Sequence, residues 1–241
     1  MIKYFAVENF RSIKKENIVE FDSGLPKDSP FVANTTIGIA GANASGKSSL
    51  LQALNFTLWF MQDSFLALDE DKNIPIEPFI TCQDASTKLH LIFTQKIEVD
   101  EVCKNVDFEY ILCLTQQEVK SETLLSYPYK RKRLIYQRIK NEIKQGNKVA
   151  KLKSEVWDNL RKNCSIVSFA AQYNSQITAK QCKNLPFESN LSNKGIIEYE
   201  FDSRILRELI EKEDFNKEEI TNLFKIADLG ISDFEVRAIS F

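Results

Sequence analysis

The sequence has few of the residues that build metal sites or disulfide frameworks. It contains one histidine, His90, and five cysteines without a C-x-x-C pair, so we expect no zinc site. His90 alternates with apolar neighbours in a strand-like run, which favours a structural role. The odd number of cysteines predicts reduced thiols in the core of a cytoplasmic protein. These cysteines are Cys82, Cys103, Cys113, Cys164 and Cys182.

Long apolar stretches are also missing. No run of 18 apolar residues occurs, so we expect no membrane span. Glu8 and Arg11 interrupt the apolar residues near the N-terminus, which therefore lacks the core of a signal peptide. With 241 residues and 43% hydrophobic residues, the chain suits one large globular domain or two small ones, in the cytoplasm.

Charge of either sign is concentrated in separate stretches, although the net charge is only −2. Residues 60–127 hold 13 acidic and 5 basic residues, and residues 188–241 hold 13 and 7. Residues 128–162 hold 12 basic and 3 acidic residues, a balance of +9. Such a run often coats a solvated face. Alternatively, it contacts the phosphate backbone of a nucleic acid, through Lys130, Arg131, Lys132 and Arg133, with Tyr127, Tyr129 and Tyr136 nearby.

One motif implies a ligand. Residues 41–48 read Gly-Ala-Asn-Ala-Ser-Gly-Lys-Ser, which fits the phosphate-loop pattern G-x-x-x-x-G-K-[ST]. Backbone N–H groups of such a loop converge on phosphate oxygens, Lys47 would reach the β- and γ-phosphates, and the Ser48 hydroxyl would hold Mg²⁺. A glycine-containing turn before a helix is the alternative. The predicted contacts to ATP are Gly41, Asn43, Ala44, Ser45, Gly46, Lys47, Ser48 and Ser49.

The residues around the motif have the expected order. Residues 35–40 are apolar and β-branched, which predicts a buried parallel strand. Residues 49–65 show apolar residues at helical spacing and predict the helix that follows a phosphate loop. Near the N-terminus, residues 2–7 and 17–21 predict a pair of strands.

Beyond residue 88 the pattern changes. Four short strand-like runs, 89–93, 108–114, 119–127 and 133–138, predict an antiparallel meander beside the nucleotide-binding sheet. Residues 148–181 read as helical, with an apolar stripe at Val156, Leu160, Cys164 and Val167. Farther on we expect helices at 203–213 and from Asn216, and a strand at 233–239.

The Asn9-Phe10-Arg11-Ser12 opening and the phosphate loop together resemble the ABC-type ATPases of the OLD, RecF and SMC group. Residues 122–138 and 227–234 resemble a narrower branch, the bacterial ATPases linked to abortive-infection, retron and restriction-associated phage defence. The resemblance implies an α/β fold, an ABC-type P-loop ATPase head with a mixed sheet, an antiparallel β meander and a helical insert. The implied domains are an N-terminal ATPase lobe (1–147), the helical insert (148–194) and a return to the lobe (195–241).

The resemblance also implies roles for side chains outside the loop. Arg11 would lie near the nucleotide phosphates, unless it is an ordinary surface arginine. A glutamine would complete the magnesium site, and Gln83 is the candidate by order, with Gln62 and Gln95 as competitors. These 241 residues contain neither a Leu-Ser-x-Gly signature nor a Walker B strand. Residues 66–70, the nearest acidic run, read as a helix end.

Three explanations of that absence stay open. The chain is the N-terminal part of a longer protein, the missing motifs belong to another chain, or hydrolysis has been lost. We therefore expect Lys47 to support hydrolysis of ATP to ADP and phosphate only if Walker B and signature elements complete the site. For these 241 residues alone, we predict binding of Mg-ATP or ADP and slow hydrolysis at best.

The expected function is an ATP-binding subunit of an anti-phage defence or DNA-linked complex. It would be a homodimer or higher oligomer whose ATP-driven closure gates a nuclease or other effector partner. Alternatives are a RecF- or SMC-like repair or chromosome-maintenance ATPase, although the helical insert is too short for a long coiled-coil arm, or a structural nucleotide-binding subunit. The sequence lacks the Asn-Lys-x-Asp motif that a GTPase needs to bind its base. Arg131, Arg133 and Arg138 resemble the arginine-rich lid of a small-molecule kinase only weakly.

Overall fold

The computed structural model of the chain describes residues 1–21, 37–99, 102–140, 142–147, 152–173 and 222. The chain divides into two units, one of residues 1–37 and 48–196 and one of residues 38–47 and 197–241. Several predicted elements lie outside the described residues, namely the helices at 203–213 and from 216, the strand at 233–239, and Cys182. The predicted domain boundaries after residues 147 and 194 stay predictions.

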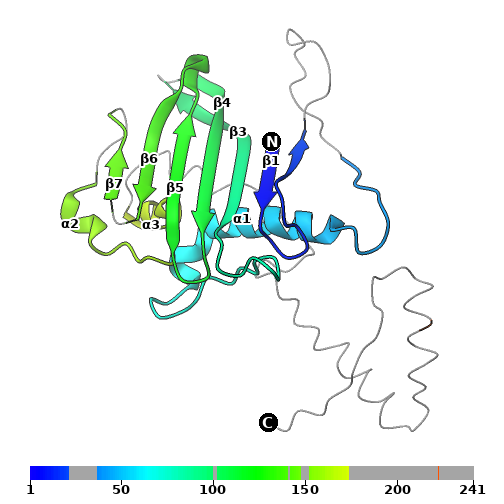
Figure 1. The fold of residues 1–241 in the computed structure, drawn as a ribbon. Coiled ribbons are helices and arrows are strands. Elements are labelled where there is room, and N and C mark those ends of the chain that lie inside the picture. Colours follow the sequence, from blue (N-terminus) through cyan, green and yellow to red (C-terminus); the bar gives the residue numbers. More distant parts are fainter. Residues whose placement is uncertain (22–36, 100–101, 141, 148–151, 174–221, 223–241) are drawn as a thin grey trace, which may run out of the picture. The chain divides into compact units, whose positions relative to one another are not determined.

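A seven-stranded sheet dominates the first unit (Figure 1). Its order is β2-β1-β3-β4-β5-β6-β7, and every neighbouring pair is antiparallel. The predicted meander is therefore confirmed, and β7 is a strand that the sequence did not indicate. The strands are β1 (Ile2–Glu8), β2 (Asn17–Glu20), β3 (Thr87–Val99), β4 (Val102–Leu114), β5 (Val119–Ser126), β6 (Arg133–Ile139) and β7 (Glu142–Gln145).

Within the described residues, the prediction of a mixed sheet is wrong. Residues 37–40, the described part of the expected parallel strand, form no strand, and Ile37 and Ile39 are exposed. A parallel strand needs hydrogen-bonded neighbours and cover on both faces. Residues 38–40 belong to the second unit, and every pair of neighbouring strands in the sheet of the first unit is antiparallel. The described part of that sheet therefore contains no parallel strand.

Alternation along the strands builds one buried face. On β3, Leu89, Leu91 and Phe93 are buried, while the residues between them are not, as expected for a sheet with one covered face. Phe93 stacks on Phe108 of β4 with ring centroids 5.4 Å apart. Each buried side chain of this size contributes about 1.5–3 kcal/mol, so this face supplies most of the cohesion of the first unit.

Helix α1 (Lys47–Ala67) lies along that buried face (Figure 1). It has no glycine or proline, and its middle is buried nearly all round. Phe56 and Phe60 stack with centroids 5.6 Å apart and are fully buried. The helix predicted from residue 49 is thus confirmed, and its apolar residues pack against the sheet through aromatic rings.

The segment 152–173 is broken into short pieces, whereas the sequence predicted a longer helix. They are α2 (Ser154–Trp157), α3 (Ile166–Ala170) and the 3₁₀ turn η2 (Ala171–Tyr173). Cys164 and Val167 of the predicted stripe are buried, but Val156 and Leu160 lie on different turns and are only half-buried. The reason lies in tertiary polar contacts, which hold the backbone between α2 and α3 in place of helical hydrogen bonds.

Those contacts centre on Glu122 of β5, which is fully buried. Its carboxylate accepts hydrogen bonds from the Tyr110 hydroxyl at 2.8 Å, the Ser165 hydroxyl at 2.6 Å and the Ile166 backbone N–H at 2.9 Å. Burial raises the pKa of Glu122, although these three donors oppose the shift. The carboxylate thus caps the start of α3 and ties it to the sheet.

Arg138 of β6, which lies opposite Glu122 in the register, also ties segment 152–173 to the sheet. It is 3% exposed and donates to the carbonyl oxygens of Cys164 at 3.0 Å and Arg161 at 3.2 Å. An arginine needs several acceptors when buried. Arg138 is therefore a structural residue and not the kinase-lid residue that one alternative would require.

Candidate nucleotide-binding site

Residues 41–47 of the predicted phosphate loop belong to the second unit, and its last residue, Ser48, belongs to the first. Its backbone turns through left-handed residues at Ala44, with φ of 60°, and Gly46, with φ of 94°. A Cβ added at Gly41 would lie 3.1 Å from the Ser45 Oγ, closer than an ordinary van der Waals contact. Glycine at positions 41 and 46 therefore allows a tight loop, the shape that lets successive N–H groups face one anion.

The Lys47 ammonium group is held against its own loop. Its Nζ donates to the carbonyl oxygens of Gly41 at 2.8 Å and Ala42 at 2.5 Å. A phosphate oxygen carries more negative charge than a carbonyl oxygen, so it can replace either acceptor in a charge-assisted bond. The contact of Lys47 with a phosphate stays a prediction.

The loop leads directly into α1, which begins at Lys47. The first four N–H groups of a helix lack partners within it and carry partial positive charge. The side chains of Asn43, Ala44, Ser45 and Ser48 are exposed. A hydroxyl oxygen such as that of Ser48 is a ligand type that Mg²⁺ accepts, so the residue fits the predicted metal role.

The predicted motif at residues 9–12 forms a tight turn after β1. Asn9 and Arg11 are both left-handed, with φ of 56° and 49°. Asn9 is 4% exposed, and its amide donates to the backbone oxygens of Cys82 at 3.1 Å and Ala85 at 2.9 Å. It also accepts from the Phe79 N–H at 3.0 Å. The asparagine of the motif therefore fixes the turn at residues 79–85.

That turn carries Gln83, the predicted magnesium ligand. Gln83 is exposed and lies four residues before β3. Of the competitors, Gln62 lies on α1 and Gln95 on β3. The Asn9 amide holds the backbone on both sides of Gln83, at Cys82 and Ala85. The role of Gln83 as a magnesium ligand stays a prediction.

Arg11 has two partners in the first unit. Its Nε lies 2.9 Å from Oε2 of Glu77, and its Nη1 donates to Oε1 of Gln52 on the second turn of α1. The neighbouring Ser12 hydroxyl lies 2.8 Å from that of Ser49, on the first turn of the same helix. The turn therefore packs beside the beginning of α1, next in the chain to Lys47 and Ser48.

Sequence reasoning missed the two partners of Arg11. Gln52 occurs five residues after Lys47 and had no distinguishing pattern, and Glu77 lies between two prolines in an extended stretch. Neither position carries a local signal, because each is chosen by tertiary contact. Ser49, a predicted nucleotide contact, is instead seen with its hydroxyl against Ser12.

The basic block lies apart from the motif at residues 9–12, at the turn between β5 and β6. Arg131, Lys132 and Arg133 line an open groove of about 1070 Å³ together with Lys144 of β7. Lys130 does not line it. Of the tyrosines noted in the sequence, Tyr129 lines the groove and Tyr136 is fully buried. Burial, together with the hydrogen bond that Tyr127 donates to Glu109, raises the pKa of Tyr127 to about 12.

The described residues lack two other kinds of functional feature. They contain no group of three histidine, cysteine, aspartate or glutamate side chains arranged to hold a metal ion. None of their helices has the length and apolar character required to cross a lipid bilayer. The phosphate loop and the groove are thus the features with recognisable chemistry.

Comparison with known proteins places the chain in a family. A family model described as an AAA domain matches residues 6–233, which span the Asn-Phe-Arg-Ser turn, the phosphate loop and the β meander. No curated protein matches the chain. Because the matched span is nearly the whole sequence, the chain belongs to the AAA domain family of P-loop ATPases, which generally bind ATP with Mg²⁺.

Proposed function

We propose that this protein binds Mg-ATP at the loop of residues 41–48. The main support is that two carbonyl oxygens of a tight, glycine-containing loop hold the Lys47 ammonium group at the start of α1. Lys47 would neutralise the β- and γ-phosphates, the loop and helix N–H groups would bind their oxygens, and Ser48 would contribute to the Mg²⁺ site. Arg11 would add a guanidinium contact after exchanging Glu77 for a phosphate.

Calorimetric titration with Mg-ATP tests this assignment. Lys47→Ala should weaken binding at least about 100-fold, because charge-assisted bonds to two phosphates contribute about 1.5–3 kcal/mol each. Lys72→Ala removes an exposed lysine beyond the end of α1 and is the matched control, for which unchanged affinity is expected. Equal affinity of wild type and Lys47→Ala would rule out this loop as the phosphate site.

We further propose that ATP closes a dimer and that closure gates a nuclease or other effector partner in phage defence or another DNA-linked process. The support is the resemblance of the Asn9–Ser12 turn and phosphate loop to ATPase heads that dimerise around ATP. A ligand shifts such an equilibrium only through its higher affinity for the closed state. Light scattering after chromatography should give a doubled mass with a non-hydrolysable ATP analogue and magnesium, and an unchanged mass for Lys47→Ala. A monomer under all conditions would remove the closure step.

Slow hydrolysis is part of the proposal. Phosphoryl transfer depends on a group that orients the attacking water and on metal ligands, and these 241 residues contain no Walker B or signature motif. A nucleotide-binding subunit without hydrolysis is therefore the second candidate. Phosphate release over hours distinguishes them, since slow release that Lys47→Ala abolishes supports an ATPase and no release supports the structural role.

A further inference from the structure

We propose that the groove between the β5–β6 turn and the β6–β7 hairpin binds a single strand of nucleic acid. The basic groove is defined by Arg131, Lys132, Arg133 and Lys144, with Tyr129 and Asn147 at its ends. Its existence does not depend on the nucleotide site, because all of these residues lie in the first unit and none belongs to the phosphate loop. This proposal therefore stands or falls separately from Mg-ATP binding.

The groove is rich in positive charge. Lys144, from β7, lines it together with three cations that are consecutive in sequence. Within the described part of the chain, no acidic side chain forms an ion pair with any of these four. Four cations without carboxylate partners create a strong positive potential in a recess, which attracts a polyanion.

The nearby acidic groups do not cancel this charge. Asp107 of β4 is paired with Lys3 at 2.7 Å, and Glu109 accepts from His90 and Tyr127. Glu142 is an exposed acid at the start of β7. Among the described residues, the cations of the groove therefore outnumber the acids named here that could neutralise them.

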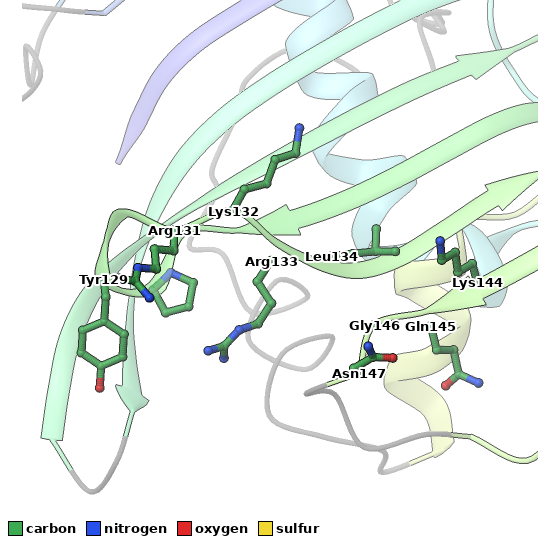
Figure 2. A pocket seen from close by; sticks show the side chains of 10 residues that line it. Tyr129, Arg131, Lys132, Arg133, Leu134, Lys144, Gln145, Gly146 and Asn147 are labelled. Carbon is green, nitrogen blue, oxygen red and sulfur yellow. The ribbon is translucent and has the colours of Figure 1, made fainter.

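The turn between β5 and β6 has an unusual backbone shape. Tyr129 and Lys130 are consecutive left-handed residues, both with φ of 58°. Figure 2 shows Tyr129 and Arg131 at one end of the groove, Gln145 and Asn147 at the other, and the Arg133 side chain between them. A row of this kind can follow successive phosphates of an extended strand.

The aromatic ring of Tyr129 favours an unpaired strand over a duplex. Tyr129 is 57% exposed, and the Lys104 ammonium lies 4.5 Å from its ring centroid and donates to its hydroxyl at 3.2 Å. An exposed ring next to cations can stack on a base that is not held in a duplex. Gln145 and Asn147 add polar groups at the far end without adding negative charge.

Fluorescence anisotropy with a labelled 20-nucleotide single strand tests the proposal, using the full chain without ATP. If all four cations contact phosphates, the logarithm of the association constant should fall with the logarithm of salt concentration with a slope of about −3. That corresponds to about a 50-fold loss between 50 and 200 mM salt. The quadruple variant R131Q/K132Q/R133Q/K144Q should bind at least about 30-fold more weakly, with a flatter slope.

The matched control changes four exposed lysines elsewhere in the first unit. The variant K15Q/K72Q/K153Q/K162Q loses the same charge and should bind nearly as the wild type does. Equal weakening in the two variants would contradict the assignment of the groove as the binding site. Unchanged urea-unfolding midpoints establish that both variants are folded.

Two further arms test the kind of ligand. Tyr129→Ala should weaken single-strand binding about 5-fold or more while Tyr129→Phe retains it, because stacking requires the ring and not the hydroxyl. A duplex of the same sequence and linear polyphosphate should each bind more weakly than the single strand. Duplex or polyphosphate binding as tight as that of the single strand would overturn the proposal, and so would an unaffected Tyr129→Ala variant.

Discussion

The phosphate loop and the basic groove are two regions suited to anions, and they are built differently. The loop of residues 41–48 uses backbone geometry, a helix N-terminus and one ammonium group at 2.5–2.8 Å from its own carbonyl oxygens. The groove uses four charged side chains from two separate segments. A backbone-built site fixes the position of a few phosphates, whereas side-chain charge attracts a polymer with little regard to its exact register.

The largest expected effect separates the two regions. Lys47→Ala should lose Mg-ATP binding at least about 100-fold and leave single-strand binding within about 2-fold of the wild type, because Lys47 does not line the groove. The quadruple groove variant should behave in the opposite way. Parallel titrations with both ligands check this. If Lys47→Ala also weakened the single strand, the distinction between the regions would fail.

The second prediction separates binding from folding, using the buried carboxylate that ties α3 to the sheet. Glu122→Ala removes the acceptor of Tyr110, Ser165 and the Ile166 N–H, which should lower the free energy of unfolding by about 3 kcal/mol. Glu122→Gln retains an acceptor and should cost far less. Urea unfolding measures both. Equal losses would mean that the lost packing, not the lost acceptor, destabilises the chain.

The same carboxyl group predicts a pH dependence. Burial raises the pKa of Glu122 in the folded state above its ordinary value, so the folded state holds that proton to higher pH than the unfolded state does. The resulting stabilisation is complete below the ordinary pKa and is lost as pH rises through the folded pKa. Between pH 5 and 8, roughly the range in which native stability usually peaks, the wild type should lose more stability than Glu122→Gln. Parallel curves for the two proteins would contradict the shift.

Arg11 offers an intermediate effect that sharpens the description of the nucleotide site. If Arg11 leaves Glu77 to bind a phosphate, Arg11→Ala should weaken Mg-ATP binding about 10-fold, the value of one charge-assisted bond. Glu77→Gln, which removes the competing carboxylate 2.9 Å from Nε, should strengthen it slightly. Calorimetry on both variants decides the matter. An Arg11→Ala variant with normal affinity would assign Arg11 to fold stabilisation alone.

The smallest effect is chemical and compares a buried thiol with an exposed one in the first unit. Burial raises the pKa of the Cys164 thiol to about 11, while Cys103, next in sequence to Lys104, is exposed. Maleimide at neutral pH should therefore modify Cys103 first and Cys164 only after unfolding. Peptide mass mapping over time measures the order. Early labelling of Cys164 in folded protein would contradict the packing of segment 152–173.

Sequence reasoning predicted local elements better than their assembly. The strands at β1, β3, β4, β5 and β6 and the helix α1 were predicted because alternation and helical spacing are local signals. Within the described residues, the strand predicted at 35–40 and the continuous helix predicted at 148–181 were wrong, because each depended on partners elsewhere. Strand pairing and the buried contacts of Glu122 decide those segments, and no local pattern encodes them.

The site shows the same division. The glycines and lysine of residues 41–48 predicted the loop, and the basic block was visible as a run of charge. Nothing in the sequence indicated that Glu77 and Gln52 hold Arg11, that Tyr136 is buried, or that Lys144 and not Lys130 lines the groove. These depend on which segments meet after folding.

The sequence by itself determined the chemistry of this protein, since the loop motif, the net charge of each stretch and the periodicity of each element are written in consecutive residues. Only the tertiary structure decided which side chains share a surface. The physical reason is that hydrogen-bond ladders and buried polar contacts join residues far apart in the chain, such as Glu122 with Ser165 and Gln137 with Lys144.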